Sequence, residues 1–298
     1  KTEEKTAVIE IAKAAGLTLL SEEERNPLYT TTYGVGEVIK DAVRNGCRKF
    51  IVGIGGSATN DGGAGMLQAL GFGLLKENGE QIPIGARGLE ELAEITDDNV
   101  IPELAECKFK IACDVTNVLC GETGASAVYG PQKGADEEMT ERLDRLLFSY
   151  ASLVKKKIPK ADSMYPGTGR QAVWDLSFLT FMDAQLESGI QIVIKETGLE
   201  QEIAKADLVI TGEGRMDGQT AMGKAPIGIA KIAKKYGKPV IAFAGAAARD
   251  AGACNEQGID AFFPILREAV SLEAAMKREN AEANMEAAVE QAYRLWRL

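Results

Sequence analysis

The sequence predicts an α/β fold, in which a parallel sheet is covered by helices on both faces. Short apolar runs of the β-branched and aromatic residues that favour strands recur at 50–54, 108–115, 206–211 and 239–245. Between them lie longer segments with apolar residues at helical spacing. Strands that alternate with helices in this way indicate a parallel sheet with both faces buried.

In the first half of the chain, glycine marks where elements stop. Asn45-Gly46 ends a helix predicted over 34–45, and Gly55-Gly56 ends the strand over 50–54, because glycine adopts backbone conformations that strain other residues. The remaining elements expected here are a strand or helix start over 6–12, a helix over 64–76, a short helix near 88–94 and a strand over 108–115.

The second half continues the alternation after an interruption. Residues 158–175 carry Pro159, Pro166 and Gly169, which break regular structure. The elements expected around this stretch are a helix over 136–157, a helix that ends near 186, strands over 190–194, 206–211, 239–245 and 261–265, a helix over 223–236 and a long terminal helix from about 272.

Composition excludes several classes of function. The 298 residues are 45% hydrophobic, enough for one large or two ordinary domains. A net charge of −10 argues against nucleic acid or an anionic membrane as main partner. No apolar run approaches a membrane span, and the charged start lacks a signal-peptide core. Five cysteines without a C-x-x-C pair argue against a zinc site and favour a reducing compartment, so we expect a cytoplasmic protein.

The sequence contains no histidine. This absence excludes Ser-His-Asp and Cys-His catalysis and every histidine-ligated metal site. Acid–base chemistry would then fall first to carboxylates, and after them to lysine, tyrosine or a thiol.

A glycine-rich polar loop follows the strand over 50–54. Gly55 and Gly56 let the backbone turn and expose its N–H groups, and Ser57, Thr59, Asn60 and Asp61 add hydroxyls, an amide and a carboxylate. A buried strand, such a loop and a helix start together predict an anion-binding corner. The alternative is a tight strand-to-helix turn whose polar residues are solvated.

Acids follow three predicted strands, and ligands of open α/β sheets bind at such strand ends. These acids are Asp61, Asp114 and the Glu213/Asp217 pair, and they favour a Mg²⁺ site that also polarises a hydroxyl. Lys133, Arg215 and Lys224 lie in glycine-bounded loops, where a cation could hold phosphate or carboxylate. For Lys133 and Lys224, each taken alone, a solvated surface charge is the favoured interpretation. Arg215 is the exception, because Glu213 and Asp217 lie at the same strand end. The G-x-G-x-x-G, Walker A and kinase H-R-D fingerprints are absent.

Four longer motifs follow one another along the chain: Gly-Ile-Gly-Gly-Ser-Ala-Thr-Asn-Asp-Gly-Gly (53–63), Ala-Cys-Asp-Val-Thr-Asn (112–117), Gly-Pro-Gln-Lys-Gly-Ala (130–135) and Thr-Gly-Glu-Gly-Arg-Met-Asp-Gly-Gln-Thr (211–220). Together they resemble the bacterial glycerate kinase family (glycerate kinase type 1). The resemblance extends to Arg-Asn-Pro-Leu-Tyr-Thr-Thr-Thr-Tyr-Gly (25–34) and covers nearly the whole chain. It implies ATP- and Mg²⁺-dependent phosphorylation of D-glycerate, at a hydroxyl that the sequence leaves open.

With this resemblance we assign candidate roles. The catalytic candidates are Asp61, Asp114, Arg215 and Asp217, with Asp61 or Asp114 as base; the ATP-binding candidates are Gly55, Gly56, Lys133, Gly212 and Gly214; the substrate-binding candidates are Ser57, Thr59 and Asn60; the metal candidates are Glu213 and Asp217. The expected partners are D-glycerate and ATP, with neither nucleic acid nor membrane, and the sequence allows a homodimer.

The resemblance also implies two α/β domains. We expect an inserted domain over 1–199 that carries the glycine-rich loop, and the C-terminal part of a flavodoxin-like sheet over 200–298. Family members begin with a segment that supplies the first strands of that sheet, and nothing like its motifs occurs here. Residues 170–176 also replace a small-residue stretch of the family with bulky side chains, which a local frame slip would explain. A non-catalytic carboxylate- or nucleotide-binding protein is therefore the rival interpretation.

Overall fold

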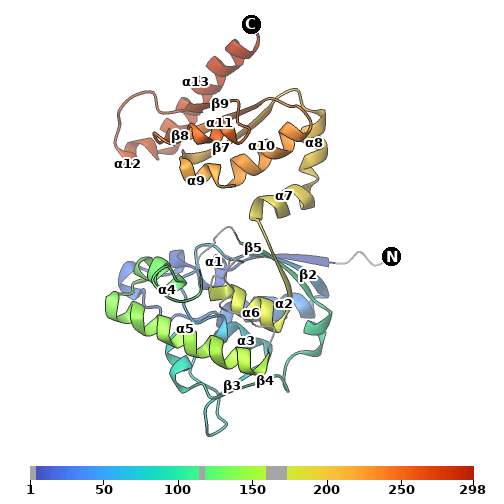
Figure 1. Ribbon diagram of the computed structural model, residues 1–298, viewed down its shortest axis with the longest axis vertical. Coiled ribbons are helices and arrows are strands. Elements are labelled where there is room, and N and C mark those ends of the chain that lie inside the picture. The colour runs from blue at the N-terminus through green and yellow to red at the C-terminus, as the bar shows by residue number, and fades with distance from the viewer. Residues whose placement is uncertain (1–4, 114–117, 159–172) are drawn as a thin grey trace. The chain divides into compact units, whose positions relative to one another are not determined.

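The computed structural model describes residues 5–113, 118–158 and 173–298 (Figure 1). The chain divides into two compact units, Lys1–Ser188 and Gly189–Leu298. The division precedes helix α7 (Gly189–Thr197), whereas the sequence placed the domain boundary after residue 199. Among the described residues, none of the helices has both the length and the apolarity that a bilayer crossing requires.

The first unit contains a four-stranded sheet in the order β1-β2-β5-β6, in which every neighbouring pair is parallel. Its strands are β1 (Lys5–Glu10), β2 (Cys47–Gly53), β5 (Lys108–Ala112) and β6 (Asp183–Glu187). Phe50 pairs with Phe109 in the register of β2 and β5, and their rings stack with centroids 4.6 Å apart. Such a cross-strand aromatic pair favours this register.

Helices and short 3₁₀ turns cover this sheet. The α-helices are α1 (Ala12–Ala15), α2 (Tyr33–Arg44), α3 (Ala64–Leu70), α4 (Ala125–Tyr129), α5 (Glu137–Lys157) and α6 (Val173–Phe181). The 3₁₀ turns are η1 (Leu17–Leu19), η2 (Glu22–Glu24), η3 (Ala86–Glu91), η4 (Pro102–Glu106) and η5 (Pro131–Lys133). The long helix α5, green in Figure 1, begins at an Asp136 side chain that accepts the Met139 N–H at 2.8 Å and ends in three lysines. Both features match the helix dipole.

Several elements differ from the sequence expectation, among them the helix expected to end near 186, which ends at Phe181 before β6. The helix predicted over 64–76 ends at Leu70, because Gly71 takes a left-handed backbone with φ 103°, and the chain then forms β3 (Gly73–Leu75), antiparallel to β4 (Glu94–Thr96). The strand predicted over 190–194 lies within helix α7, and the strand is the preceding β6. A short apolar run does not by itself distinguish a strand from a buried helix, and here Ile190 packs against Gly228 of α10.

The second unit contains a parallel sheet in the order β7-β8-β9. Its strands are β7 (Val209–Met216), β8 (Val240–Ala247) and β9 (Ala261–Pro264), and its further helices are α8 (Leu199–Lys205), α9 (Gly218–Ala221), α10 (Ala225–Lys235), α11 (Ala253–Glu256), α12 (Leu272–Ala275) and α13 (Arg278–Trp296). The terminal helix is thus divided into α12 and α13. The fold class is α/β, as the alternation predicted.

Candidate functional site

The glycine-rich loop between β2 and α3 is buried. Ser57, Thr59, Asn60 and Asp61 are between 0% and 8% exposed, so the alternative of a solvated polar turn is wrong. Gly62 and Gly63 have φ of 66° and 80°, and a Cβ on Gly63 would lie 2.6 Å from Ser177 Oγ. Only glycine fits this bend without strain. The exposed Gly55 and Gly56 form its entry.

Asp61 is the hub of this loop. Its Oδ2 accepts hydrogen bonds from the Thr32 N–H at 2.9 Å, the Thr32 hydroxyl at 3.0 Å, the Thr31 hydroxyl at 3.3 Å and the Gly65 N–H at 3.3 Å. Its Oδ1 accepts the Gly63 N–H at 3.1 Å. Burial raises the pKa of Asp61, while these donors oppose the rise. The carboxylate therefore ties the segment before α2 to the start of α3.

Lys133 is the cation of this region. It lies in η5, is 5% exposed, and its Nζ donates to the Thr59 carbonyl at 2.6 Å. Burial lowers its pKa to about 8, and the nearby Asp61 charge opposes that change. Gly134, at φ 91°, follows it and passes so close to the Arg25 carbonyl that a Cβ would lie 2.3 Å from the oxygen. Lys133 is thus not a solvated surface charge.

The Asn60 side chain is held from α4. Its Nδ2 donates to Ser126 Oγ at 2.9 Å, and both residues are 0% exposed. Asn60 Oδ1 is buried and has no hydrogen-bond partner among the described residues. A buried acceptor without a donor is uncommon, and it matches a position where a ligand supplies the donor.

Five of the predicted site residues are buried in the loop between β2 and α3 or in the adjoining turn η5: Ser57, Thr59, Asn60, Asp61 and Lys133. Asp114, the other predicted base, lies outside the described residues, as do residues 170–172 of the altered stretch. Thr31, Thr32 and Ser126 were not among the site residues that the sequence predicted. The run of hydroxyl residues over 30–32 was visible, but nothing in it identified Asp61 as its partner. Ser126 carried no local signal.

In the second unit, β7 extends further than predicted. The sequence placed Gly212, Glu213, Gly214 and Arg215 in a loop, whereas they lie within the strand Val209–Met216. A Cβ on Gly212 would lie 2.4 Å from the Phe243 carbonyl oxygen. A glycine inside a strand often marks such a close backbone approach, so Gly212 serves the pairing of β7 with β8.

Glu213 and Asp217 are joined through Thr220. The Thr220 hydroxyl donates to Glu213 Oε1 and accepts the Asp217 N–H at 3.1 Å, while Asp217 Oδ1 caps α9 by accepting the Gln219 N–H at 3.0 Å. Lys224 Nζ lies 3.9 Å from Asp217 Oδ1. Within the described parts of the chain, no three acids or cysteines group as a metal site, but Mg²⁺ uses one or two carboxylates with phosphate and water.

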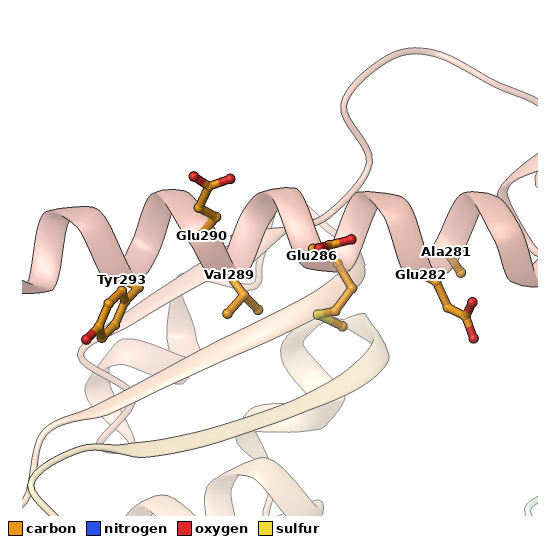
Figure 2. A pocket seen from close by; sticks show the side chains of 7 residues that line it. Ala281, Glu282, Glu286, Val289, Glu290 and Tyr293 are labelled. Carbon is orange, nitrogen blue, oxygen red and sulfur yellow. The ribbon is translucent and has the colours of Figure 1, made fainter.

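A separate groove runs along α13. Figure 2 shows Val289 and Tyr293 on one side of the helix and Glu290 on the other. The groove is also lined by Ala281, Glu282, Met285 and Glu286, and none of its lining residues belongs to the predicted site. Its three glutamates disfavour an anionic ligand, so it is not a candidate for binding a phosphate or a carboxylate.

Comparisons with known proteins agree with these motifs. The model of the glycerate kinase family matches residues 1–297. The chain is 48% identical to a glycerate kinase of Halalkalibacterium halodurans and 47% identical to the glycerate 2-kinase of Escherichia coli, in each case over 92% of this chain and 72% of the relative. A crystal structure from Salmonella typhimurium LT2, assigned as a glycerate kinase 2, matches 97% of this chain and 75% of that chain with a TM-score of 0.80 and 46% identity. This chain therefore belongs to the glycerate kinase family.

Proposed function

We propose that this protein is a glycerate kinase, which transfers the γ-phosphoryl group of ATP to a hydroxyl of D-glycerate. The observation that carries the proposal is the family match over residues 1–297. The buried residues Asn60 and Lys133 support the proposal independently. Asn60 has an amide oxygen without a hydrogen-bond donor among the described residues, and Lys133 is a cation bonded to the neighbouring Thr59 carbonyl. A small hydroxy acid offers the complementary groups, a hydroxyl donor and a carboxylate.

In the first unit, the residues divide into binding and organising groups. Lys133 is proposed to bind the substrate carboxylate or a phosphate oxygen, with Ser57 and Thr59 beside it, and Asn60 to accept a substrate hydroxyl. Asp61 holds the loop in place, because its five hydrogen bonds enclose both oxygens. Asp114 stays the predicted base. Gly55 and Gly56 are exposed, and their missing side chains would let a phosphate approach the backbone.

In the second unit, Glu213 and Asp217 are proposed to hold Mg²⁺. Each carboxylate uses one oxygen in the hydrogen bonds around Thr220. The other oxygens, Glu213 Oε2 and Asp217 Oδ2, take no part in these bonds among the described residues. A magnesium ion would neutralise charge on the ATP phosphates. Arg215, with Gly212 and Gly214 beside it on β7, is proposed to contact the phosphates.

The acceptor is proposed to be the 2-hydroxyl of glycerate. The support is the name of the Escherichia coli relative, glycerate 2-kinase, which is 47% identical to this chain. The ³¹P NMR spectrum of the reaction product separates 2-phosphoglycerate from 3-phosphoglycerate. A product that is entirely 3-phosphoglycerate would overturn this assignment but leave the kinase function intact.

A coupled assay tests the function itself. ADP release should require both D-glycerate and Mg²⁺, and should fall to background when either is omitted. Calorimetric titration with D-glycerate and with an ATP analogue runs in parallel. Tight binding of either ligand without ADP release would refute the kinase and leave a binding protein derived from this family.

A further inference from the structure

Ser126 connects the two parts of the candidate substrate site. It lies in the first turn of α4 and is 0% exposed. Its hydroxyl oxygen accepts the Asn60 Nδ2 hydrogen bond at 2.9 Å, and its carbonyl accepts the Gly130 N–H at 2.8 Å. Gly130 begins the turn that ends at Lys133, because the Lys133 N–H donates to the Gly130 carbonyl at 2.9 Å. One serine thus holds the Asn60 amide by its side chain and the Lys133 turn by its backbone.

In the contact with Ser126, the nitrogen end of the Asn60 amide is engaged. The amide nitrogen is the donor to Ser126 Oγ, so the carbonyl oxygen Oδ1 is left over. This oxygen is buried and has no partner among the described residues. An amide has two donors and an acceptor, and without an anchor on its nitrogen it could turn over and present N–H groups where the acceptor now lies.

Lys133 supplies the complementary group close by. Its Nζ is bonded to the carbonyl of Thr59, the residue before Asn60, and an ammonium group carries three donors. The site therefore offers an acceptor and a cation on neighbouring residues. A ligand that satisfies both carries a hydrogen-bond donor, such as a hydroxyl, next to an anionic group.

We propose that Ser126 is a positioning residue for the substrate: it anchors the Asn60 amide nitrogen so that Oδ1 accepts a hydrogen bond from a hydroxyl of the hydroxy acid, while Lys133 binds the carboxylate. The inference rests on the proposed function for the identity of the hydroxy acid. It predicts that Ser126 affects recognition of the hydroxyl and leaves recognition of the carboxylate and of ATP unchanged.

Steady-state kinetics of Ser126→Ala test this role. The KM for D-glycerate should rise about tenfold, while the KM for ATP and the inhibition constant of propanoate, which has the carboxylate but no hydroxyl, stay within about twofold. Ser126→Cys, of nearly the same volume but a weaker acceptor, should change the KM in the same direction and covers the case in which the alanine variant does not fold. Ser152→Ala is the control, because Ser152 is also a helix serine, but its hydroxyl donates to the Phe148 carbonyl at 2.8 Å and the residue is only partly buried.

A double-mutant cycle separates positioning from a general structural role. If Ser126 acts through Asn60, Ser126→Ala should have no further effect on the KM for D-glycerate in an Asn60→Ala background. Additive effects, an equal loss of propanoate binding, or an unchanged KM in both Ser126 variants would overturn the inference. If the parent protein releases no ADP, the kinase proposal fails separately, and calorimetric binding of D-glycerate makes the same comparison of variants.

Discussion

Asp61→Asn tests whether the buried carboxylate organises the glycine-rich loop. Asparagine has nearly the same shape, but one of its two terminal groups is a donor. Four donors converge on Oδ2, so the asparagine side chain loses the fewest hydrogen bonds if its amide oxygen takes the Oδ2 position. The new NH₂ group then faces the Gly63 N–H, which now donates to Oδ1 at 3.1 Å. Two buried donors would oppose each other without an acceptor.

The expected cost follows from these two donors. Each buried donor without a partner costs about 1–3 kcal/mol, and relief of the buried charge offsets part of the sum, so we expect a net loss of about 2–4 kcal/mol in the free energy of unfolding. The loss should also depend on pH. Because the pKa of Asp61 is raised above its ordinary value of 3.8, its stabilising contribution is fully present below that value and is lost as the pH rises through the raised pKa. The difference between parent and variant should therefore widen from pH 7 towards pH 4.

Urea unfolding followed by far-UV circular dichroism measures both effects, with the transitions of the two units fitted separately. Asp144→Asn is the matched control, because Asp144 accepts the Gly121 N–H with both oxygens, at 3.0 and 3.1 Å, but is only partly buried. Its loss should stay below about 1 kcal/mol. Turnover of Asp61→Asn should fall at least about tenfold through the displaced loop. An Asp61→Asn protein with parental stability and near-parental turnover would refute the reasoning.

Three further predictions concern the same two regions. Burial lowers the pKa of Lys133 to about 8, so the free energy of unfolding of the parent should increase as the pH rises from about 8 to the ordinary lysine pKa. Lys133→Met should remove this increase. If urea unfolding shows the same pH dependence in parent and variant, the prediction is wrong. Gly63→Ala should lower the free energy of unfolding by more than about 2 kcal/mol, because the new methyl group meets Ser177. Gly79→Ala is the control: Gly79 has a φ of 82° but open space around it, so only the backbone strain of about 1 kcal/mol is expected. Equal shifts in melting temperature would show that the contact with Ser177 does not matter. Thr220→Val should raise the Mg²⁺ concentration needed for half-maximal activity several-fold. Thr220→Ser keeps the hydroxyl that is bonded to Glu213, so its Mg²⁺ dependence should stay close to that of the parent. The same Mg²⁺ dependence in both variants would show that Thr220 has no part in the metal site.

The helices and strands that the sequence predicted correctly have strong local signals. Helix α5 combines an Asp136 cap, helical spacing of its leucines and lysines at its end, all of which are visible in the sequence. The errors arose where local signals are ambiguous. The apolar run over 190–194 suits a strand or a helix equally well, and its packing against α10 decides for the helix. The glycines over 212–214 suggested a loop, but the close approach of β8 places them in a strand.

The sequence by itself determined the α/β class, the absence of histidine chemistry and the family, because these depend on composition, periodicity and contiguous motifs. It also predicted Asn60, Asp61 and Lys133 as site residues. Only the tertiary structure decided how they are held. Asp61 is bonded to Thr32, Asn60 to Ser126 and Lys133 to Thr59, at separations of 29, 66 and 74 residues. Such contacts arise when strands from distant parts of the chain pair in one sheet and bring their loops together, and no local pattern encodes which loops meet.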